Sequence, residues 1–218
     1  MLIFTPSEVG EERAEGLLAG CLAHVDAVQV RVKAPQRRSG PSPAAELRDW
    51  TRRVLGLRAG LEPSRRPLVL VNDRVDVAQL LAPDGVDGVH LGQSDAPPSV
   101  ARELLGPDLL IGLSTDGART LLAAEEQPVD YLGLGPIFPS GTKGYERGLG
   151  PEKAWALAAG VGRPVFPIGG IDRANALELL PLGRAAVGAG ILAADDPGRA
   201  AAELRELLCD PSGESPAG

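Results

Sequence analysis

Two aspartates each end a short apolar run of this chain, where a carboxylate could bind a metal ion. Asp73 ends the run 68–73, and Asp95 ends the run 88–95. The segment 74–82 between them has about the length of one short helix. If the two runs are neighbouring parallel strands, both carboxylates emerge at the same edge of the sheet. Carboxylates together with the phosphates of a substrate bind hard divalent cations, so this pair predicts phosphate chemistry.

Other polar side chains stand at or just past further strand-like runs. Gln29, Arg31 and Lys33 alternate along one segment and therefore share one face of a strand. We expect an anion site here rather than a set of exposed charges, because Gln29 and Arg31 lie within the strand itself. A histidine in an apolar run is usually a core residue, but His90 stands close to the sheet edge, and we expect it to face a ligand.

Hydroxyl groups follow the fifth strand-like run. Ser114 and Thr115 could bind phosphate oxygens, or they could cap the helix that begins near Gly117. Both alternatives stay open on local grounds.

The glycine-rich segment 136–151 is too long for a bare connector. It contains Lys143, and we expect it to act as a mobile lid that brings a charge over a bound polyphosphate.

Glycine turns follow the last two strand-like runs. Gly169 and Gly170 come after one of them, and Gly188 and Gly190 come after the other. Main-chain N–H groups near a helix start can hold a phosphate dianion. We therefore expect a phosphate cradle, with close packing of the glycines as the alternative.

The elements that must position these residues alternate regularly along the chain. Strand-like runs alternate with segments that have apolar residues at helical spacing, which is typical of an α/β fold. We expect a (β/α)8 TIM barrel as a single domain over residues 1–209, with a doubly wound open sheet as the alternative, and a disordered C-terminal tail over 210–218. The predicted strands are 2–5, 27–31, 68–72, 88–91, 109–114, 131–135, 165–168 and 185–187, and the predicted helices are 8–22, 44–57, 74–82, 98–105, 117–126, 152–159, 173–180 and 197–208.

The composition excludes several classes of protein. The net charge of −7 argues against binding to nucleic acid, which requires a basic face. No apolar run approaches the roughly 20 residues of a membrane span, and no segment resembles a signal peptide, so we expect a cytoplasmic protein without membrane contact. Cys21 and Cys209 are far apart and lack metal-ligand spacing, so we expect buried or idle thiols.

Several short motifs, each at its own strand end, together resemble one enzyme family over residues 2–208. The chain resembles thiamine-phosphate synthase and its thiazole-tautomerase relatives. The motifs are Gln29-x-Arg31-x-Lys33, Asn72-Asp73-Arg74, Gly88-Val89-His90-Leu91-Gly92-Gln93-Ser94-Asp95, Gly112-Leu113-Ser114, Gly135-Pro136-Ile137-Phe138, Thr142-Lys143 and Gly169-Gly170-Ile171 followed by Asn175.

The resemblance implies an activity and a site. The reaction joins 4-amino-2-methyl-5-hydroxymethylpyrimidine diphosphate to 4-methyl-5-(2-hydroxyethyl)thiazole phosphate and releases pyrophosphate. Asp73 and Asp95 are implied to hold Mg²⁺ on the diphosphate. The remaining implied contacts are Arg31, Lys33, Asn72, Ser114 and Lys143 for the diphosphate oxygens, Gln29 and His90 for the pyrimidine, and Thr142, Gly169, Gly170, Gly188 and Gly190 for the thiazole phosphate.

Departures from the family pattern bear on the alternatives. Asp116 stands where tautomerase relatives usually carry a catalytic histidine, and Gly190 and Val32 replace a usual Ser and Glu. A tautomerase-like or ligand-binding regulatory relative without synthase activity is the main alternative. A phosphosugar isomerase or epimerase would need an acid/base pair, and His90 is the one histidine expected at the site. A homo-oligomer is compatible with the sequence.

Overall fold

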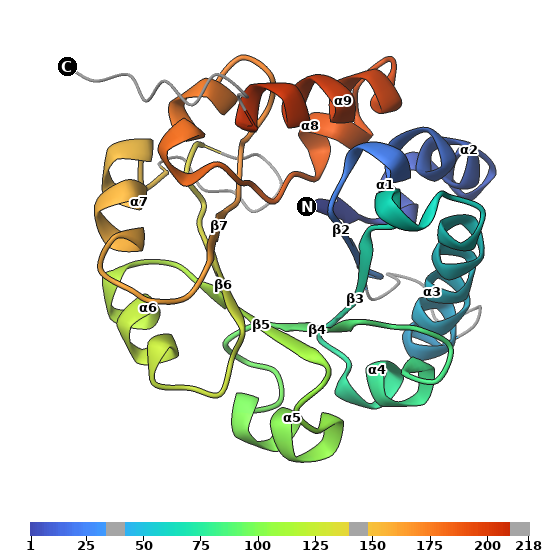
Figure 1. Cartoon of the computed structure of the whole chain (residues 1–218), viewed down its shortest axis with the longest axis horizontal. Helices are drawn as coiled ribbons and strands as arrows, with labels where there is room; N and C mark the ends of the chain where they lie inside the picture. Colours follow the sequence, from blue (N-terminus) through green and yellow to red (C-terminus); the bar gives the residue numbers. More distant parts are fainter. Residues whose placement is uncertain (34–41, 140–147, 210–218) are drawn as a thin grey trace.

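Seven parallel strands form one curled sheet in which every strand pairs with its neighbour in the chain (Figure 1). Their side chains form short, nearly continuous apolar runs, as expected for strands covered on both faces. Seven of the eight predicted strands are therefore present in a single parallel α/β domain. The strands are β1 (Leu2–Phe4), β2 (Ala27–Val30), β3 (Leu68–Asn72), β4 (Gly88–Leu91), β5 (Leu110–Thr115), β6 (Tyr131–Leu134) and β7 (Val165–Pro167).

The computed structural model describes residues 1–33, 42–139 and 148–209. The central part of the predicted lid, 140–147 with Thr142 and Lys143, and the predicted tail 210–218 lie outside the described residues.

The eighth predicted strand, 185–187, is not formed as a strand. It makes two single bridges, one from Ala186 to Ile168 and one from Val187 to Leu2. These bridges join the two edges of the sheet, but one bridge on each side does not make a ladder. The expectation of an eight-stranded barrel is thus met only in part.

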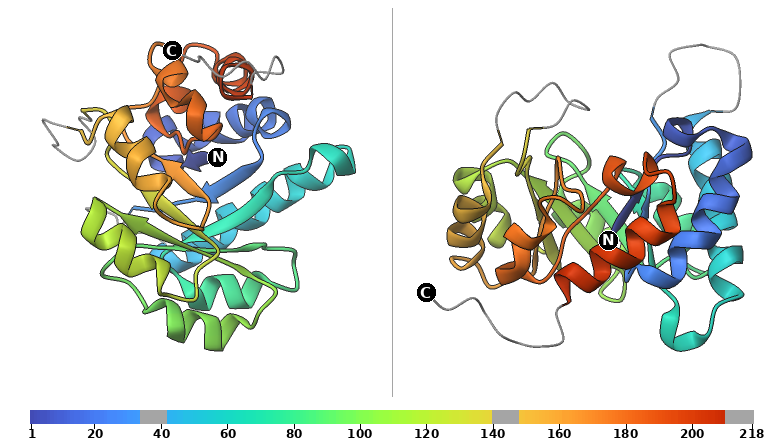
Figure 2. Two further views of the ribbon diagram at one scale, coloured as in Figure 1. Left: turned by 60° about the vertical axis from the view of Figure 1, so that its left-hand side comes forward. Right: turned by 90° about the horizontal axis from the view of Figure 1, so that it is seen from above.

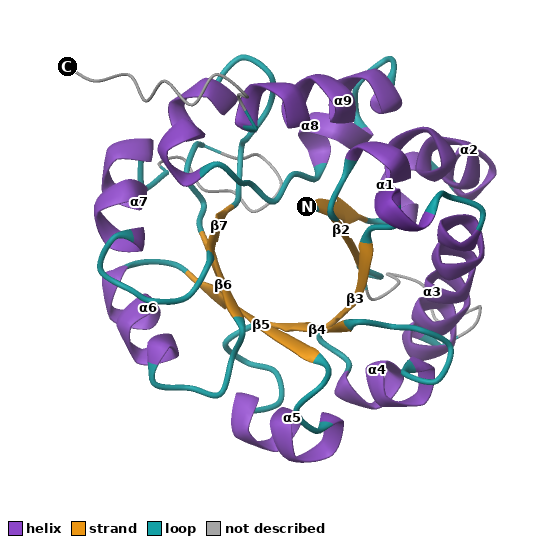
Figure 3. Ribbon diagram, viewed as in Figure 1, coloured by secondary structure: helices purple, strands orange, loops and turns teal. Residues whose placement is uncertain are grey.

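Helices cover the outside of the curled sheet, while the strands line its inside (Figures 2 and 3). Several helices begin with a proline in the first turn, as in α3, whose Ser42 hydroxyl also accepts a hydrogen bond from Ala45 N at 3.2 Å. The α-helices are α1 (Pro6–Val9), α2 (Glu11–Cys21), α3 (Pro43–Ala59), α4 (Val75–Leu81), α5 (Pro98–Leu105), α6 (Ala118–Glu125), α7 (Pro151–Ala158), α8 (Ala189–Leu192) and α9 (Pro197–Leu208), and the 3-10 helices are η1 (Leu22–His24), η2 (Pro63–Arg65) and η4 (Ala176–Leu182).

Two predicted helices differ from the observed ones. The predicted helix 8–22 is interrupted at Gly10, whose φ of 81° ends α1 before α2 begins. The predicted helix 173–180 is replaced by the 3-10 helix η4, which contains Pro181. Proline lacks the N–H group and crowds the preceding turn, which disfavours a regular α-helix at this point.

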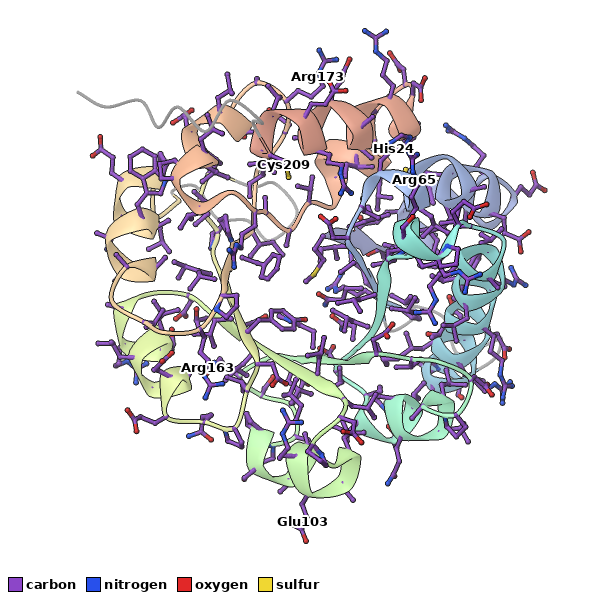
Figure 4. The ribbon with its side chains drawn as sticks, in the orientation of Figure 1. His24, Arg65, Glu103, Arg163, Arg173 and Cys209 are labelled. Carbon is purple, nitrogen blue, oxygen red and sulfur yellow. The ribbon has the colours of Figure 1, made fainter. Side chains whose placement is uncertain are left out.

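The main core lies between the sheet and the helices. Phe4 of β1 packs edge-on against Trp50 of α3, with ring centroids 5.6 Å apart, and both side chains are buried. Glu103 on α5 points outward from the layer of helices (Figure 4). Within the described ranges, no helix has the length and apolar character needed to cross a membrane.

A repeated aspartate ties the helices to the starts of alternate strands. Asp87, just before β4, accepts hydrogen bonds at 2.6 Å from Arg58 and at 2.7 Å from a main-chain N–H of β3. Asp130, just before β6, accepts the corresponding hydrogen bonds, at 2.6 Å from Arg102 and at 2.7 Å from a main-chain N–H of β5. These contacts fix the end of the sheet opposite to the predicted site.

Candidate active site

A cavity of about 940 Å³ opens at the carboxyl ends of the strands and extends into the interior of the curled sheet. Its size is that of a small-molecule site. Among the predicted site residues that the structure describes, all but Lys33 line it. They are Gln29, Arg31, Asn72, Asp73, His90, Asp95, Ser114, Gly169, Gly170, Gly188 and Gly190.

Asp73 lies directly after β3 in an unusual backbone conformation. Its φ of 63° is the one positive value for a non-glycine residue in the described part of the chain. Asp73 N donates to the carbonyl of His90 at 2.8 Å, and Arg74 N donates back to the carbonyl of Asn72 at 2.8 Å. The tight turn after β3 is thus tied to β4, and positive-φ strain of this kind is typically found at functional sites.

The two carboxyl groups meet, as their positions after neighbouring parallel strands predicted. Asp73 is exposed at the cavity mouth, but its carboxyl contacts Asp95. Partial burial of the carboxyl itself, and then the hydrogen bond and charge of Asp95, raise the pKa of Asp73 to about 6, while the charge of Arg31 opposes this rise. Asp95 is itself held by Gly92 N, which donates to Oδ2 at 2.7 Å. Two carboxylates this close repel each other unless a proton or a cation lies between them.

A row of amides supports the carboxylate pair. The buried Gln29 donates a short hydrogen bond from Nε2 to Oδ1 of the buried Asn72. Asn72 in turn forms a hydrogen bond with the carboxyl of Asp73. This hydrogen bond lowers the pKa of Asp73, but burial and Asp95 raise it by more. This arrangement fixes the amide orientation of Asn72 next to the metal-binding candidate.

Lys33 does not reach the cavity but pairs with a carboxylate on its wall. Lys33 Nζ lies 2.5 Å from Glu8 Oε1, and Glu8 on α1 lines the cavity. The expected anion site on β2 therefore has Arg31 in the cavity and Lys33 at its edge. Glu8 was missed in the sequence because it falls inside a predicted helix rather than after a strand.

His90 is buried and uses both ring nitrogens. Nδ1 lies 2.9 Å from Tyr131 Oη, and Nε2 lies 2.8 Å from Ser114 Oγ.

The hydroxyls of Ser114 and Thr115 do not cap the next helix, because Ser114 contacts His90 and Thr115 donates to a carbonyl of β6. Thr120 takes that role, because its hydroxyl accepts hydrogen bonds from the two N–H groups just before α6.

The glycine turns after β7 have a clear packing reason. Gly169 and Gly170 have φ values of 99° and 67°, and a side chain on Gly169 would press on Pro136. The close-packing alternative is thus supported for these positions. At the other turn, Gly188 and Gly190 line the cavity, and no hydrogen bond among the described residues uses their N–H groups.

The structure adds an aromatic pair to the cavity that the sequence did not reveal. Tyr131 and Phe166 pack edge-on, with ring centroids 5.5 Å apart. Both belong to the inside of the sheet, at the start or middle of a strand. The rule that site residues lie just past strand ends therefore does not reach them, although an aromatic residue within the short strand Val165–Pro167 was a signal.

The carboxylate pair fits a divalent cation. In the described ranges no group of three or more His, Cys, Asp or Glu side chains gathers, so the protein would supply two carboxylates and leave the other positions to substrate and water. That is the usual donor set for Mg²⁺ at a phosphate site. A cation would also relieve the repulsion from Asp95, which adds to the larger effect of burial in raising the pKa of Asp73.

Comparison with known proteins gives a consistent family. The family model described as "Thiamine monophosphate synthase" matches residues 1–193. A "Thiamine-phosphate synthase" of Mycobacterium sp. (strain KMS) is 43% identical over 205 residues, covering 90% of this chain and 85% of that protein. Another of the same name, from Synechococcus sp. (strain CC9605), is 40% identical over 209 residues, covering 95% of this chain. The chain spans only 54% of the length of the Synechococcus protein.

A solved structure with the same fold carries a related name. "Thiamine phosphate pyrophosphorylase" from Pyrococcus furiosus superposes with a TM-score of 0.76 at 32% identity, covering 95% of this chain and 94% of its own.

Proposed function

Because this chain belongs to the thiamine monophosphate synthase family, we propose that it joins an aminopyrimidine diphosphate to a thiazole phosphate and releases pyrophosphate. The observation that carries this proposal is the close pair Asp73 and Asp95 beside Arg31 in one cavity. The pair and the arginine suit a diphosphate with its metal ion, and the rest of the cavity has room for the two rings.

The leaving-group half of the site lies after strands β2 to β5. Asp73 and Asp95 would hold Mg²⁺, which supplies positive charge against the charge that develops on the departing diphosphate. Arg31 adds a permanent positive charge, and Asn72 is held in place to donate from its amide. Ser114 adds a hydroxyl, and we assign Lys33 and Lys143 to the outer oxygens of the diphosphate.

The pyrimidine would occupy the interior of the curled sheet. Gln29 and His90 are buried and line the cavity, and Tyr131 and Phe166 form an aromatic wall beside His90. Loss of the diphosphate leaves a pyrimidine-methyl cation that its amino group stabilises, so the chain needs no nucleophile of its own. What it must supply is orientation of the ring and exclusion of water.

The second phosphate would bind at the opposite side of the cavity. We assign it to Thr142 and to main-chain N–H groups at Gly169, Gly170, Gly188 and Gly190. The N–H groups of Gly188 and Gly190 support this assignment, since no described residue accepts from them. The thiazole nitrogen can then attack the methyl cation held between the two phosphate groups.

We also propose several finer features of the chain. Residues 1–209 make one domain, in which 185–187 acts as the eighth strand of a barrel. The protein is a cytoplasmic enzyme that acts on small molecules, as a monomer or as a homo-oligomer. A tautomerase role is not favoured, because Asp116 at the position of the usual histidine accepts a hydrogen bond from Thr120 at 2.7 Å.

The decisive experiment is incubation of the purified protein with both phosphorylated substrates and Mg²⁺. Thiamine phosphate and pyrophosphate should form in equal amounts, and EDTA should stop the reaction. Failure to form product at any Mg²⁺ concentration would overturn the proposal.

Lys143→Ala should lower kcat by about 10²-fold if this lysine stabilises the leaving group. Lys153→Ala, an exposed lysine on α7, is the matched control.

A further inference from the structure

Three side chains form a hydrogen-bonded row across the inside of the curled sheet. Tyr131 Oη lies 2.9 Å from His90 Nδ1, and Ser114 Oγ lies 2.8 Å from His90 Nε2. They come from the start of β6, the middle of β4 and the end of β5. His90 and Tyr131 are both buried, with exposed fractions of 8% and 6%. The row therefore links a buried phenol to a hydroxyl at the predicted diphosphate site.

A glycine makes this row sterically possible. In the strand register, His90 of β4 is the partner of Gly112 of β5, which is the partner of Tyr131 of β6. Because Gly112 has no side chain, the tyrosine ring can cross over β5 to reach the imidazole. A Cβ atom on Gly112 would overlap the Tyr131 ring and its hydroxyl. The contact thus depends on a residue that belongs to neither partner.

The row determines which histidine nitrogen carries the proton. Burial, and then the charge of Asp130, raise the pKa of Tyr131 well above its usual value, so the phenol keeps its proton. Among the described residues, the hydrogen bond to His90 Nδ1 is the one that the Tyr131 hydroxyl makes. A buried hydroxyl must donate its proton somewhere, and Nδ1 can accept it only if the imidazole proton is on Nε2.

The choice of tautomer then decides what Ser114 offers to a ligand. If Nε2 carries the proton, it donates to Ser114 Oγ, and the serine proton is free to point into the cavity. In the opposite tautomer, Ser114 would donate to the histidine and turn lone pairs toward the cavity. A phosphate oxygen requires a donor, so only the first arrangement suits an anion.

We propose that Tyr131 is a positioning residue that holds His90 in the Nε2–H tautomer, so that Ser114 donates its hydroxyl hydrogen to the diphosphate. The identity of the ligand as a diphosphate rests on the proposed function, whereas the tautomer of His90 follows from the hydrogen bonds alone. Tyr131 acts through His90 and need not touch the reacting atoms.

The tautomer can be read directly by NMR of protein labelled with ¹⁵N-histidine. The chain has two histidines, and the other, His24, lies outside the ring of strands (Figure 4). At about pH 8, His90 should show an unprotonated Nδ1 and a protonated Nε2. Tyr131→Phe should change the His90 nitrogens toward a mixture of tautomers and leave His24 unchanged. Phe166→Leu alters the packing on Tyr131 but removes no hydrogen-bonding group of the row, so it should keep the wild-type His90 tautomer.

Kinetics supplies the second readout. Tyr131→Phe and Ser114→Ala should each lower kcat/KM for the diphosphate substrate by about tenfold or more, the range for a hydrogen bond to a charged group. The double variant should be little worse than either single one, because both remove the same donor.

Two results would overturn the proposal: a wild-type His90 that carries its proton on Nδ1, or a Tyr131→Phe variant with unchanged His90 shifts. The predicted tautomer in a protein without synthase turnover would support the positioning of Ser114 and overturn the proposed function instead.

Discussion

Replacement of Asp73 by asparagine should stabilise the metal-free protein at neutral pH while removing its response to Mg²⁺. Asparagine has nearly the shape of aspartate, and it tolerates the left-handed conformation that the φ of 63° requires. The substitution therefore removes the charge without disturbing the turn after β3. An alanine at this position would add backbone strain and confuse the comparison.

The size of the effect follows from the raised pKa of Asp73, which burial of its carboxyl and then the contact with Asp95 produce. The pKa of Asp73 is raised from 3.8 to about 6 in the folded protein. The folded state then binds more protons than the unfolded state between these values, so stability falls as the pH rises from about 4 to about 6 and is constant above. Each pKa unit corresponds to about 1.4 kcal/mol, but exposure at the cavity mouth screens the charges. We expect a cost of about 1 kcal/mol, or about 2–4 °C in Tm.

Thermal unfolding followed by circular dichroism measures this cost. In EDTA, Asp73→Asn should have a higher Tm than the wild type at about pH 8 and an equal Tm at about pH 4. Mg²⁺ should raise the Tm of the wild type and leave the variant unchanged, because binding to the folded state alone stabilises it. Asp108→Asn, an exposed aspartate before β5, is the control. A variant less stable than the wild type at pH 8 in EDTA would refute the repulsion between the two carboxylates.

Three further predictions concern other contacts. Glu8→Gln removes the carboxylate that pairs with Lys33, so calorimetry should find Mg-pyrophosphate bound up to about fivefold more tightly; weaker binding would show that Glu8 instead positions the lysine. Asp130→Asn should lower the free energy of unfolding in urea by about 1–3 kcal/mol, since it breaks hydrogen bonds to an arginine and to β5, with unchanged stability as the contrary result. Burial raises the pKa of the Cys21 thiol to about 12, while Cys209 is exposed. A thiol reagent should therefore modify one cysteine in the folded protein and two after denaturation, and two rapid modifications in the folded protein would contradict this.

The positions of the charged site residues could be predicted from the sequence because they follow a local rule. A polar residue just past a buried strand of a parallel sheet lies at the carboxyl edge, whatever the rest of the fold does. Asp73 and Asp95 follow β3 and β4, which pair directly, and their carboxyl groups meet. Seven strands were found for a similar reason, since short apolar runs between helical segments mark them.

The rule failed where pairing depends on single contacts or on backbone geometry. The segment 185–187 reads as a strand, yet it makes one bridge to each edge of the sheet. The first predicted helix spans 8–22 without a break, yet the positive φ of Gly10 divides it. Local spacing carries no information about whether a short run finds a partner of matching length.

The sequence by itself determined the family through its motifs. It also determined the parallel α/β architecture and the acids at the strand ends, because the spacing of apolar and polar residues along each segment is a local property. Only the tertiary structure decided which side chains of the site contact one another. Tyr131 meets His90 across Gly112 although 41 residues separate them, and Lys33 meets Glu8 across 25 residues. Such contacts follow from the register between strands and the path of the loops, which are set when the whole chain packs.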